Sequence, residues 1–172
     1  MLGLLLLVFR RTRRVPVHRL ALFEECTDLV LHEWDERRGI DLRPEVAEVE
    51  AYLRPVAEDL AFAAMSTGVP QLQVREIAES SQVLARWLPQ TVERTSVAEK
   101  VARHLLDRAS ILDNVGRDEA GRRVVRFTHR SFSEFLASSY AMKNLEDDEL
   151  LELIERLVAD SSLAGLAELL IQ

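Results

Sequence analysis

His129 is the residue of this chain whose position best suits binding an anion. It stands between a β-like run, residues 123–128, and a helical pattern that begins at Ser131. A strand would deliver the imidazole to the first turn of a helix, where free N–H groups and the helix dipole favour negative charge. Imidazole is also protonated close to neutral pH, so a phosphate group would suit it as a ligand. The spacing alone favours a simpler role, in which the histidine caps the helix or packs against it.

Other residues offer little catalytic chemistry. The segment GRDEAGRR, residues 116–123, has the glycine spacing of a phosphate-binding loop, but arginines replace the required Lys and Ser/Thr. Such a loop must also join a strand to a helix, whereas this one joins two β-like runs, so a hairpin turn is the better interpretation. The four histidines, His18, His32, His104 and His129, are far apart in the sequence. We therefore predict no catalytic residues and no metal site.

Cys26 is the only cysteine, so the chain forms no internal disulfide, and we predict a reducing, cytoplasmic environment. Its place at an apolar helix position predicts a core residue, and no partner base that would make it a nucleophile can be assigned. The carboxylate pairs Glu24-Glu25 and Asp147-Asp148 are typical of solvated helix faces.

Length and composition predict an acidic globular protein. The 172 residues are 48% hydrophobic and 30% charged, with a net charge of −7. This charge repels a nucleic-acid backbone, so nucleic acid is an unlikely partner unless a local basic patch binds it. Arg10, Arg11, Arg13 and Arg14 form the one such patch, directly after an apolar run that ends at Phe9. That run is too short to span a bilayer, so we predict a buried helix with a solvated basic turn and no membrane association.

Helical periodicity dominates the first two thirds of the chain. Apolar residues recur at three- and four-residue steps over 18–34, 44–64, 74–87 and 96–109. Pro55 falls inside the second segment and predicts either a kink or two short helices. Ser96 and Glu99 have the spacing of a capping box, which predicts that the fourth helix begins at Ser96.

Residues 111–115 and 123–128 are short β-rich runs and predict a hairpin. A helix over 131–144 follows, with Ser131 as its N-cap, Glu134 completing a capping box, and Phe132, Phe135, Leu136 and Tyr140 on one face. Two short amphipathic helices, separated by residues 160–162, complete the sequence. The fold class is therefore mainly α: a helical segment over 1–45, a winged-helix domain with a small β-hairpin wing over 46–143, and the start of a C-terminal helical domain over 144–172.

The stretch FTHRSFSEFLA, residues 127–137, resembles the motif F-x-H-x-(S/T)-F-x-E-(F/Y)-(F/L)-A, which closes the winged-helix domain of NACHT ATPases. These proteins belong to the STAND class of signalling NTPases. The first 38 residues are similar to the segment that follows the nucleotide-binding core in that family. Shared features are a leucine-rich helix over 2–7, a basic turn over 10–14, Pro16, and a helix that ends in Trp34-Asp-Glu-Arg37. The resemblance covers residues 2–143 in the same order.

The resemblance implies a nucleotide-gated switch. In NACHT proteins a winged-helix histidine touches the nucleotide phosphates and helps to lock the ADP-bound form, and ATP exchange then permits oligomerisation. His129 is the position that matches this sensor. The phosphate-loop and magnesium-binding motifs are absent from the sequence, and the family's Asn-Pro would fall just before Met1. We therefore expect the back half of a NACHT module, which does not hydrolyse ATP on its own.

The resemblance also sets the expected cofactors and partners. ADP or ATP with Mg would bind only the complete module, whose NTPase core would be supplied in cis or in trans and which would form homo-oligomers. Defence or stress signalling is the expected role. Two alternatives of other classes remain open: a free-standing winged-helix DNA-binding protein, and a helical scaffold that binds a protein partner through exposed apolar surface.

Overall fold

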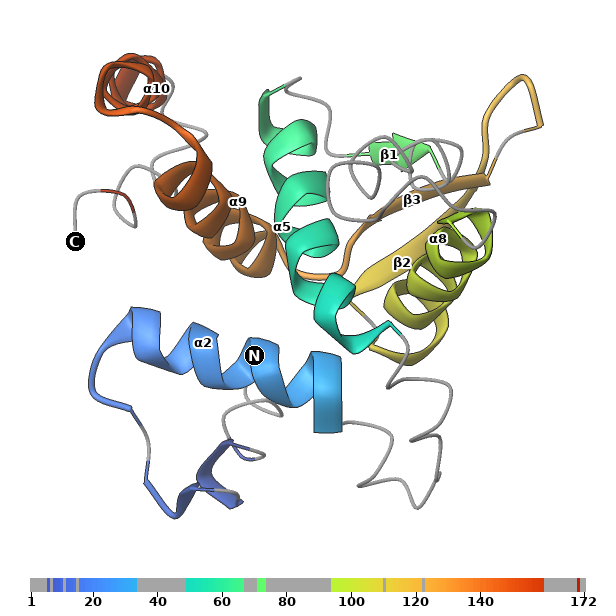
Figure 1. Cartoon of the computed structure of the whole chain (residues 1–172), viewed down its shortest axis with the longest axis horizontal. Helices are drawn as coiled ribbons and strands as arrows, with labels where there is room; N and C mark the ends of the chain where they lie inside the picture. Colours follow the sequence, from blue (N-terminus) through green and yellow to red (C-terminus); the bar gives the residue numbers. More distant parts are fainter. Residues whose placement is uncertain are drawn as a thin grey trace.

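A computed structural model describes residues 6, 8–10, 12–14, 16–33, 49–66, 71–73, 94–109, 111–121, 123–159 and 170. The fold is mainly helical, as predicted (Figure 1). Its helices are α2 (Arg19–Asp28), α5 (Glu50–Ser66), α8 (Arg94–Arg103), α9 (Arg130–Asn144) and α10 (Asp147–Ala159), with the π-helical turns η1 (Leu29–Glu33) and η2 (His104–Arg108). The strands are β1 (Gln71–Gln73), β2 (Leu112–Arg117) and β3 (Arg123–Phe127). The predicted helix over 74–87 and the segment after residue 159, apart from Leu170, lie outside the described residues.

The three strands form one small antiparallel sheet in the order β1-β3-β2. Strands β2 and β3 are the predicted hairpin, which is thereby confirmed. The register between them shifts at residues 114–116, where a bulge leaves Val115 unpaired. Gly116 there has φ of 141°, a conformation that side-chain-bearing residues rarely adopt. Strand β1 was not predicted from the sequence, and it pairs with residues 124–126 of β3.

The core lies where α5 and α9 pack along each other beside the sheet (Figure 1). Both helices bury a stripe with helical spacing, as the periodicity predicts. The fully buried residues on these helices and on the central strand include Leu53, Val56, Ala61, Leu136, Ala137, Ala141 and Val125. On α8 and η2 the predicted face is also buried, at Val101, Leu105 and Ala109. The hairpin and the helix that follows it are therefore held on one continuous core.

Aromatic rings join α2 to α9. Phe23 is buried and stacks on Phe135, with ring centroids 5.6 Å apart and planes at 19°. It meets Phe132 edge to face at 5.9 Å. Cys26 lies in a small neighbouring cluster with Val8 and Phe132, so its predicted role as a core residue is confirmed. Such aromatic pairs add about 0.5–1.5 kcal/mol beyond the area that they bury.

Several local predictions are wrong. Helix α5 runs unbroken through Pro55, which excludes two short helices. Helix α8 begins at Arg94, so Ser96 lies within its first turn and is not the N-cap. The predicted buried helix at the N-terminus is buried at Val8, but Leu6 and Phe9 are 58% and 44% exposed. Within the described part of the chain, no helix has both the length and the apolar character that crossing a membrane requires.

Candidate functional site

His129 lies at the junction between β3 and α9, as the sequence predicts. Its backbone is extended, with φ of −132° and ψ of 123°, which makes it the N-cap residue of α9. The imidazole is exposed and makes no capping hydrogen bond to the helix. The simpler interpretation of a side-chain cap is therefore not what the geometry shows. Among the described residues, the ring has no hydrogen-bond or ion-pair partner.

Backbone contacts on both sides of His129 fix its position. The N–H and the hydroxyl of Thr128 both donate to the carbonyl oxygen of Ile111, at 2.8 and 2.7 Å. The carbonyl oxygen of His129 accepts from the N–H groups of Phe132 and Ser133, at 3.0 and 3.2 Å. Phe132 is itself anchored against α2. The result is a rigid backbone that holds a free imidazole in solvent, which suits a binding role that needs no rearrangement of the chain.

The predicted capping box at this junction is wrong. Helix α9 begins at Arg130, so Ser131 lies inside the first turn. Glu134 is buried and pairs with Arg130, whose Nε lies 2.8 Å from the Glu134 Oε1. This i,i+4 pair takes the carboxylate that a capping box would direct to the backbone. It also means that the cation next to His129 is already paired.

The other three histidines lie in different environments. Nε2 of buried His104 lies 2.9 Å from the carbonyl oxygen of Leu31, which links η2 to η1. Nδ1 of His32 lies 3.4 Å from Oε1 of Glu50. His18 is exposed at the N-cap of α2 and, like His129, makes no capping bond with its side chain. Within the described ranges, no three His, Cys, Asp or Glu side chains are grouped as metal ligands would be.

The segment that has the glycine spacing of a phosphate loop is a hairpin tip. Strand β2 ends at Arg117 and β3 begins at Arg123, with no helix between them. The N–H of Gly121 donates to the carbonyl oxygen of Asp118 at 2.9 Å, and Nη1 of Arg117 donates to the Gly121 carbonyl at 2.7 Å. This confirms the predicted turn.

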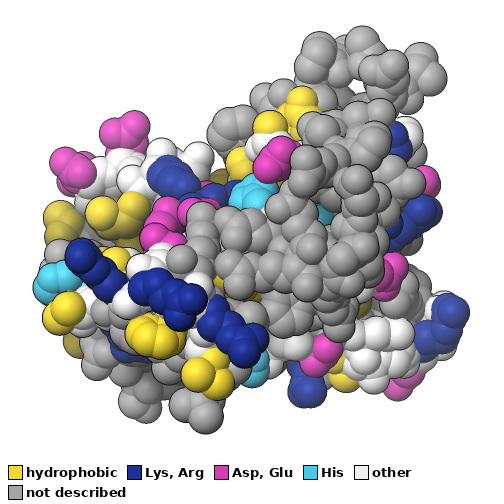
Figure 2. Space-filling model, turned by 90° about the horizontal axis from the view of Figure 1, so that it is seen from below, with side chains coloured by type: hydrophobic (Ala, Val, Ile, Leu, Met, Phe, Trp, Pro, Cys, Tyr) yellow, Lys and Arg dark blue, Asp and Glu magenta, His cyan; other side chains and the backbone are white. Residues whose placement is uncertain are grey.

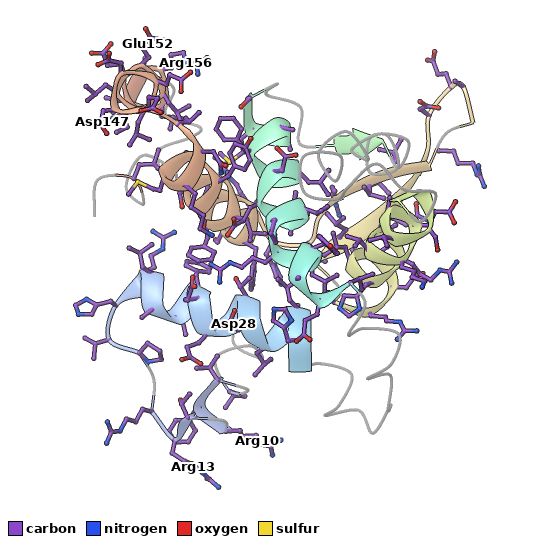
Figure 3. All side chains as sticks on the ribbon, viewed as in Figure 1. Arg10, Arg13, Asp28, Asp147, Glu152 and Arg156 are labelled. Atoms are coloured by element: carbon purple, nitrogen blue, oxygen red, sulfur yellow. The ribbon has the colours of Figure 1, made fainter. Side chains whose placement is uncertain are left out.

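A charged network between α2, α5 and α9 was not predicted from the sequence; Figure 3 labels Asp28, its member at the edge. Arg54 of α5 donates twice to the Glu24 carboxylate, from Nη1 and Nη2 at 2.7 Å each, and from Nε to Oε1 of Glu58 at 2.9 Å. Nη1 also lies 3.4 Å from Oδ1 of Asp28. An arginine fork matches a carboxylate in two parallel bonds, and here it joins α5 to α2. The hydrogen bond from Arg54 lowers the pKa of Glu24, and the bond to Glu24 raises the pKa of Arg54.

Glu58 is the centre of this network and is only 3% exposed. Besides Arg54 it accepts from the Lys143 ammonium, at 2.7 and 3.0 Å, and from the Ser139 hydroxyl at 2.7 Å. Burying a carboxylate is costly unless charged and polar donors compensate for the lost water, as Arg54, Lys143 and Ser139 do here. The network therefore ties three helices together through one buried carboxylate, and its contacts are those of a structural residue.

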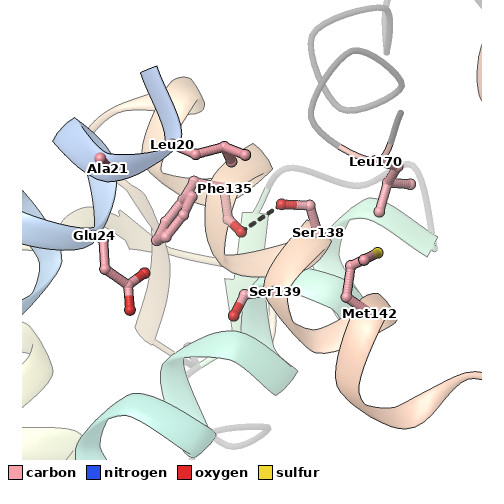
Figure 4. A pocket seen from close by; sticks show the side chains of 8 residues that line it. All are labelled: Leu20, Ala21, Glu24, Phe135, Ser138, Ser139, Met142 and Leu170. Carbon is pink, nitrogen blue, oxygen red and sulfur yellow. Dashed lines mark hydrogen bonds between the residues drawn. The ribbon is translucent and has the colours of Figure 1, made fainter. Parts of the chain in front are cut away.

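An open cavity of about 370 Å³ lies between α2 and α9 beside this network (Figure 4). It is lined by Leu20, Ala21, Glu24, Phe135, Ser138, Ser139, Met142 and Leu170. Its polar groups already have partners, since Ser138 donates to the Phe135 carbonyl at 2.8 Å, Ser139 to Glu58, and Glu24 holds Arg54. The cavity offers mostly apolar surface and no group arranged for acid–base chemistry.

Comparison with known proteins finds no relative of this chain. No protein-family model, curated protein sequence or solved structure matches the chain. Functional inference therefore depends on the residues themselves, of which the exposed His129 is the one predicted site residue.

Proposed function

We propose that this chain is the regulatory, nucleotide-sensing part of a NACHT/STAND signalling ATPase. The observation that carries the proposal is the state of His129. It stands within the motif FTHRSFSEFLA on a fixed backbone, with its imidazole exposed and unpartnered among the described residues. A sensor histidine needs this combination, because the ligand must find the ring already in place and free to bind.

The order of elements supports a winged-helix domain over residues 46–143. Helix α5, strand β1, helix α8 and the hairpin β2–β3 follow one another, and β1 pairs with β3. Helices followed by a β-hairpin are what we expect of a winged-helix module. Helix α9 continues directly from the wing and carries the aromatic residues of the motif. In this proposal residues 1–45, which include α2, precede the domain, and residues 144–172, which include α10, follow it.

The proposed mechanism is a change in affinity between two domain arrangements. In one arrangement the His129 ring donates to a phosphate oxygen of ADP bound in the NTPase core; in the other it does not. A contact present in only one state shifts the equilibrium by its own free energy. The complete module would supply the core, the nucleotide and Mg²⁺. The chain alone is not an enzyme in this scheme, and its partner is that core, in cis or in trans.

The DNA-binding alternative gains no support from the helix that would enter a groove. The exposed charges of α8 and η2 are mixed, with Glu99 and Asp107 beside Lys100 and Arg103. Duplex binding depends on neutralising phosphates with cations, and a mixed face does this poorly. A salt-sensitive shift of duplex DNA by the purified chain would nevertheless favour that function over ours.

The test uses the complete module with His129→Ala and the matched control His18→Ala. Both histidines are exposed N-cap residues without a side-chain cap bond, so neither replacement removes a contact that holds the fold. We expect His129→Ala to release ADP about 10-fold faster or more, since a hydrogen bond to a charged group contributes about 1.5–3 kcal/mol. It should also raise basal oligomerisation. Equal ADP retention in the wild type and both variants would refute the sensor role.

A further inference from the structure

The N-terminal end of the described chain is basic and apolar. Arg10, Arg13 and Arg14 are exposed, and no described residue forms a salt bridge with their side chains. Exposed apolar residues flank these arginines in the sequence, namely Leu6 and Phe9 before them and Val17 after them, the last of them 94% exposed. We call these six residues the basic end. No acidic residue precedes Glu24 in the sequence, so the sequence neighbours of these arginines do not neutralise them. Figure 2 shows basic side chains interspersed with hydrophobic ones on this face.

Arg13 adds a second observation at the basic end. Its φ is 56°, in the left-handed region, where glycine would cost less. The turn is held by the N–H of Arg13, which donates to the Phe9 carbonyl at 2.9 Å, and by the Thr12 hydroxyl, which donates to the Arg14 carbonyl at 2.6 Å. Strained backbone of this kind is concentrated at functional sites. The turn directs consecutive arginines outward at the end of the molecule.

Helix α10 carries the opposite charge and, like the basic end, exposes apolar side chains. Its inner face is buried at Leu153 and Leu157, whereas Leu151 and Val158 are 60% and 68% exposed. These two residues are seven apart and therefore lie on one face of the helix. Exposed acidic residues surround them, namely Asp147, Asp148, Glu152 and Glu155, with Arg156 as the one exposed cation of the helix. We call Leu151, Val158 and these four carboxylates the acidic end.

The two ends lie on opposite sides of the molecule. Figure 3 shows Asp147 and Glu152 on α10 at the top and Arg10 and Arg13 at the bottom, with α9 and α2 between them. Within one chain they therefore cannot meet. We propose that the basic end of one copy docks on the acidic end of a second copy, in a head-to-tail contact.

Charge complementarity and the distribution of exposed apolar residues carry this proposal. Among the described residues, the large exposed apolar side chains are Leu6, Phe9, Val17, Val115, Met142, Leu151 and Val158, and five of the seven belong to the two ends. Opposite charges around apolar centres give both an attraction that steers the partners and an area to bury. A contact between two different surfaces repeats on each new copy, so it builds open chains or rings. It does not depend on the nucleotide role of His129.

The first test is sedimentation of the purified chain over a range of concentration and salt. We expect reversible assembly beyond a dimer at low salt and its loss at high salt, because exposed charges are screened. A chain that stays monomeric at all concentrations, or that stops at a closed dimer, overturns the proposal.

Charge reversal at one end at a time gives the decisive test. One variant carries Arg10→Glu with Arg14→Glu, and the other carries Glu152→Lys with Glu155→Lys. Each should associate with itself at least about 10-fold more weakly than the wild type. Mixed together, the two variants again offer opposite charges, because the unmodified ends match each other and the two reversed ends also carry opposite signs. We therefore expect the mixture to recover assembly, with the two variants alternating.

Two controls separate docking from general effects. Arg103→Glu with Arg126→Glu makes the same charge change at exposed residues outside both ends, and it should assemble like the wild type. Arg13→Gly relieves the left-handed strain, so it should raise the melting temperature while weakening assembly. Self-association that survives in both end variants would overturn the proposal. So would a mixture that stays monomeric, or a basic end that binds vesicles of anionic lipid while the chain does not self-associate.

Discussion

Replacing Arg54 with alanine should destabilise the protein strongly, because it removes the charge that links α2 to α5 and to Glu58. The bond from Nε to the buried Glu58 carboxylate contributes about 1.5–3 kcal/mol, the range for hydrogen bonds to charged groups. The two bonds to Glu24 contribute no more than about 1 kcal/mol, since that carboxylate is half exposed. Asp28 adds almost nothing at 3.4 Å. The sum is a loss of about 2–4 kcal/mol in the free energy of unfolding.

Urea unfolding followed by circular dichroism measures this loss directly. For a chain of this length, it corresponds to a fall in melting temperature of about 4–16 °C. Arg54→Lys is the informative companion, because it keeps the charge and removes the two-pronged bond to Glu24. It should lose less than Arg54→Ala. Arg10→Ala, at an exposed position, is the control and should stay within about 0.5 kcal/mol of the wild type.

The reasoning would be refuted if Arg54→Ala also unfolded within about 0.5 kcal/mol of the wild type. In that case Lys143 and Ser139 alone would satisfy Glu58, whose three polar donors would not act together. A double-mutant cycle of Arg54→Ala and Glu24→Ala then measures how much free energy the bond between these two residues contributes. A coupling near zero would mean that the ion pair between Arg54 and Glu24 does not stabilise the packing of α2 against α5.

Further predictions concern residues that pack on the same helices. Phe23→Ala removes a buried ring that stacks on Phe135, so it should cost about 3–5 kcal/mol in chemical denaturation, and Phe23→Leu should cost clearly less. The pKa of Glu24 lies below its ordinary value of 4.5 because Arg54 donates to it, so its contribution to stability is present above pH 4.5 and is lost as pH falls through the folded-state pKa. Glu24→Gln should flatten this acid limb of the stability profile, and an unchanged limb would contradict the assignment. Burial raises the pKa of the Cys26 thiol, so at pH 8 a disulfide reagent should modify it about 10-fold or more slowly in the native protein than in denaturant. Fast native reaction would show that the small cluster around this thiol opens readily.

The hairpin and the aromatic face of α9 could be predicted from the sequence because their signals are local. Short runs with β-branched residues flank a glycine-containing turn, and Phe132 and Phe135 share one face of a helix. Strand β1 has no such signal, since QLQ becomes a strand only by pairing with Val125 and its neighbours. The capping box failed because two local interactions competed for Glu134, and the ion pair with Arg130 prevailed.

The charged network could not be predicted because its partners are far apart in the sequence. Lys143 and Glu58 are 85 residues apart, and no spacing pattern connects them. One local sign was available: Arg54 and Glu58 are four residues apart on a helix, with the glutamate next to the apolar stripe. At the site itself, the sequence predicted where His129 lies. Its exposure and its lack of a capping bond depend on how the chain turns, which the sequence pattern does not specify.

The hairpin tip provides a place to attach a reporter. Residues 118–121 form an exposed turn that projects from the side of the molecule away from both α10 and α2 (Figure 1). A β-carbon at Gly121 would meet no atom within 4 Å, which shows how open this turn is, although its φ of 75° is best left to glycine. An inserted tag between Glu119 and Ala120 should be tolerated, as insertions usually are at exposed loop tips. Two copies labelled there, one with a donor dye and one with an acceptor, would report the contact between ends by energy transfer while both ends stay unmodified.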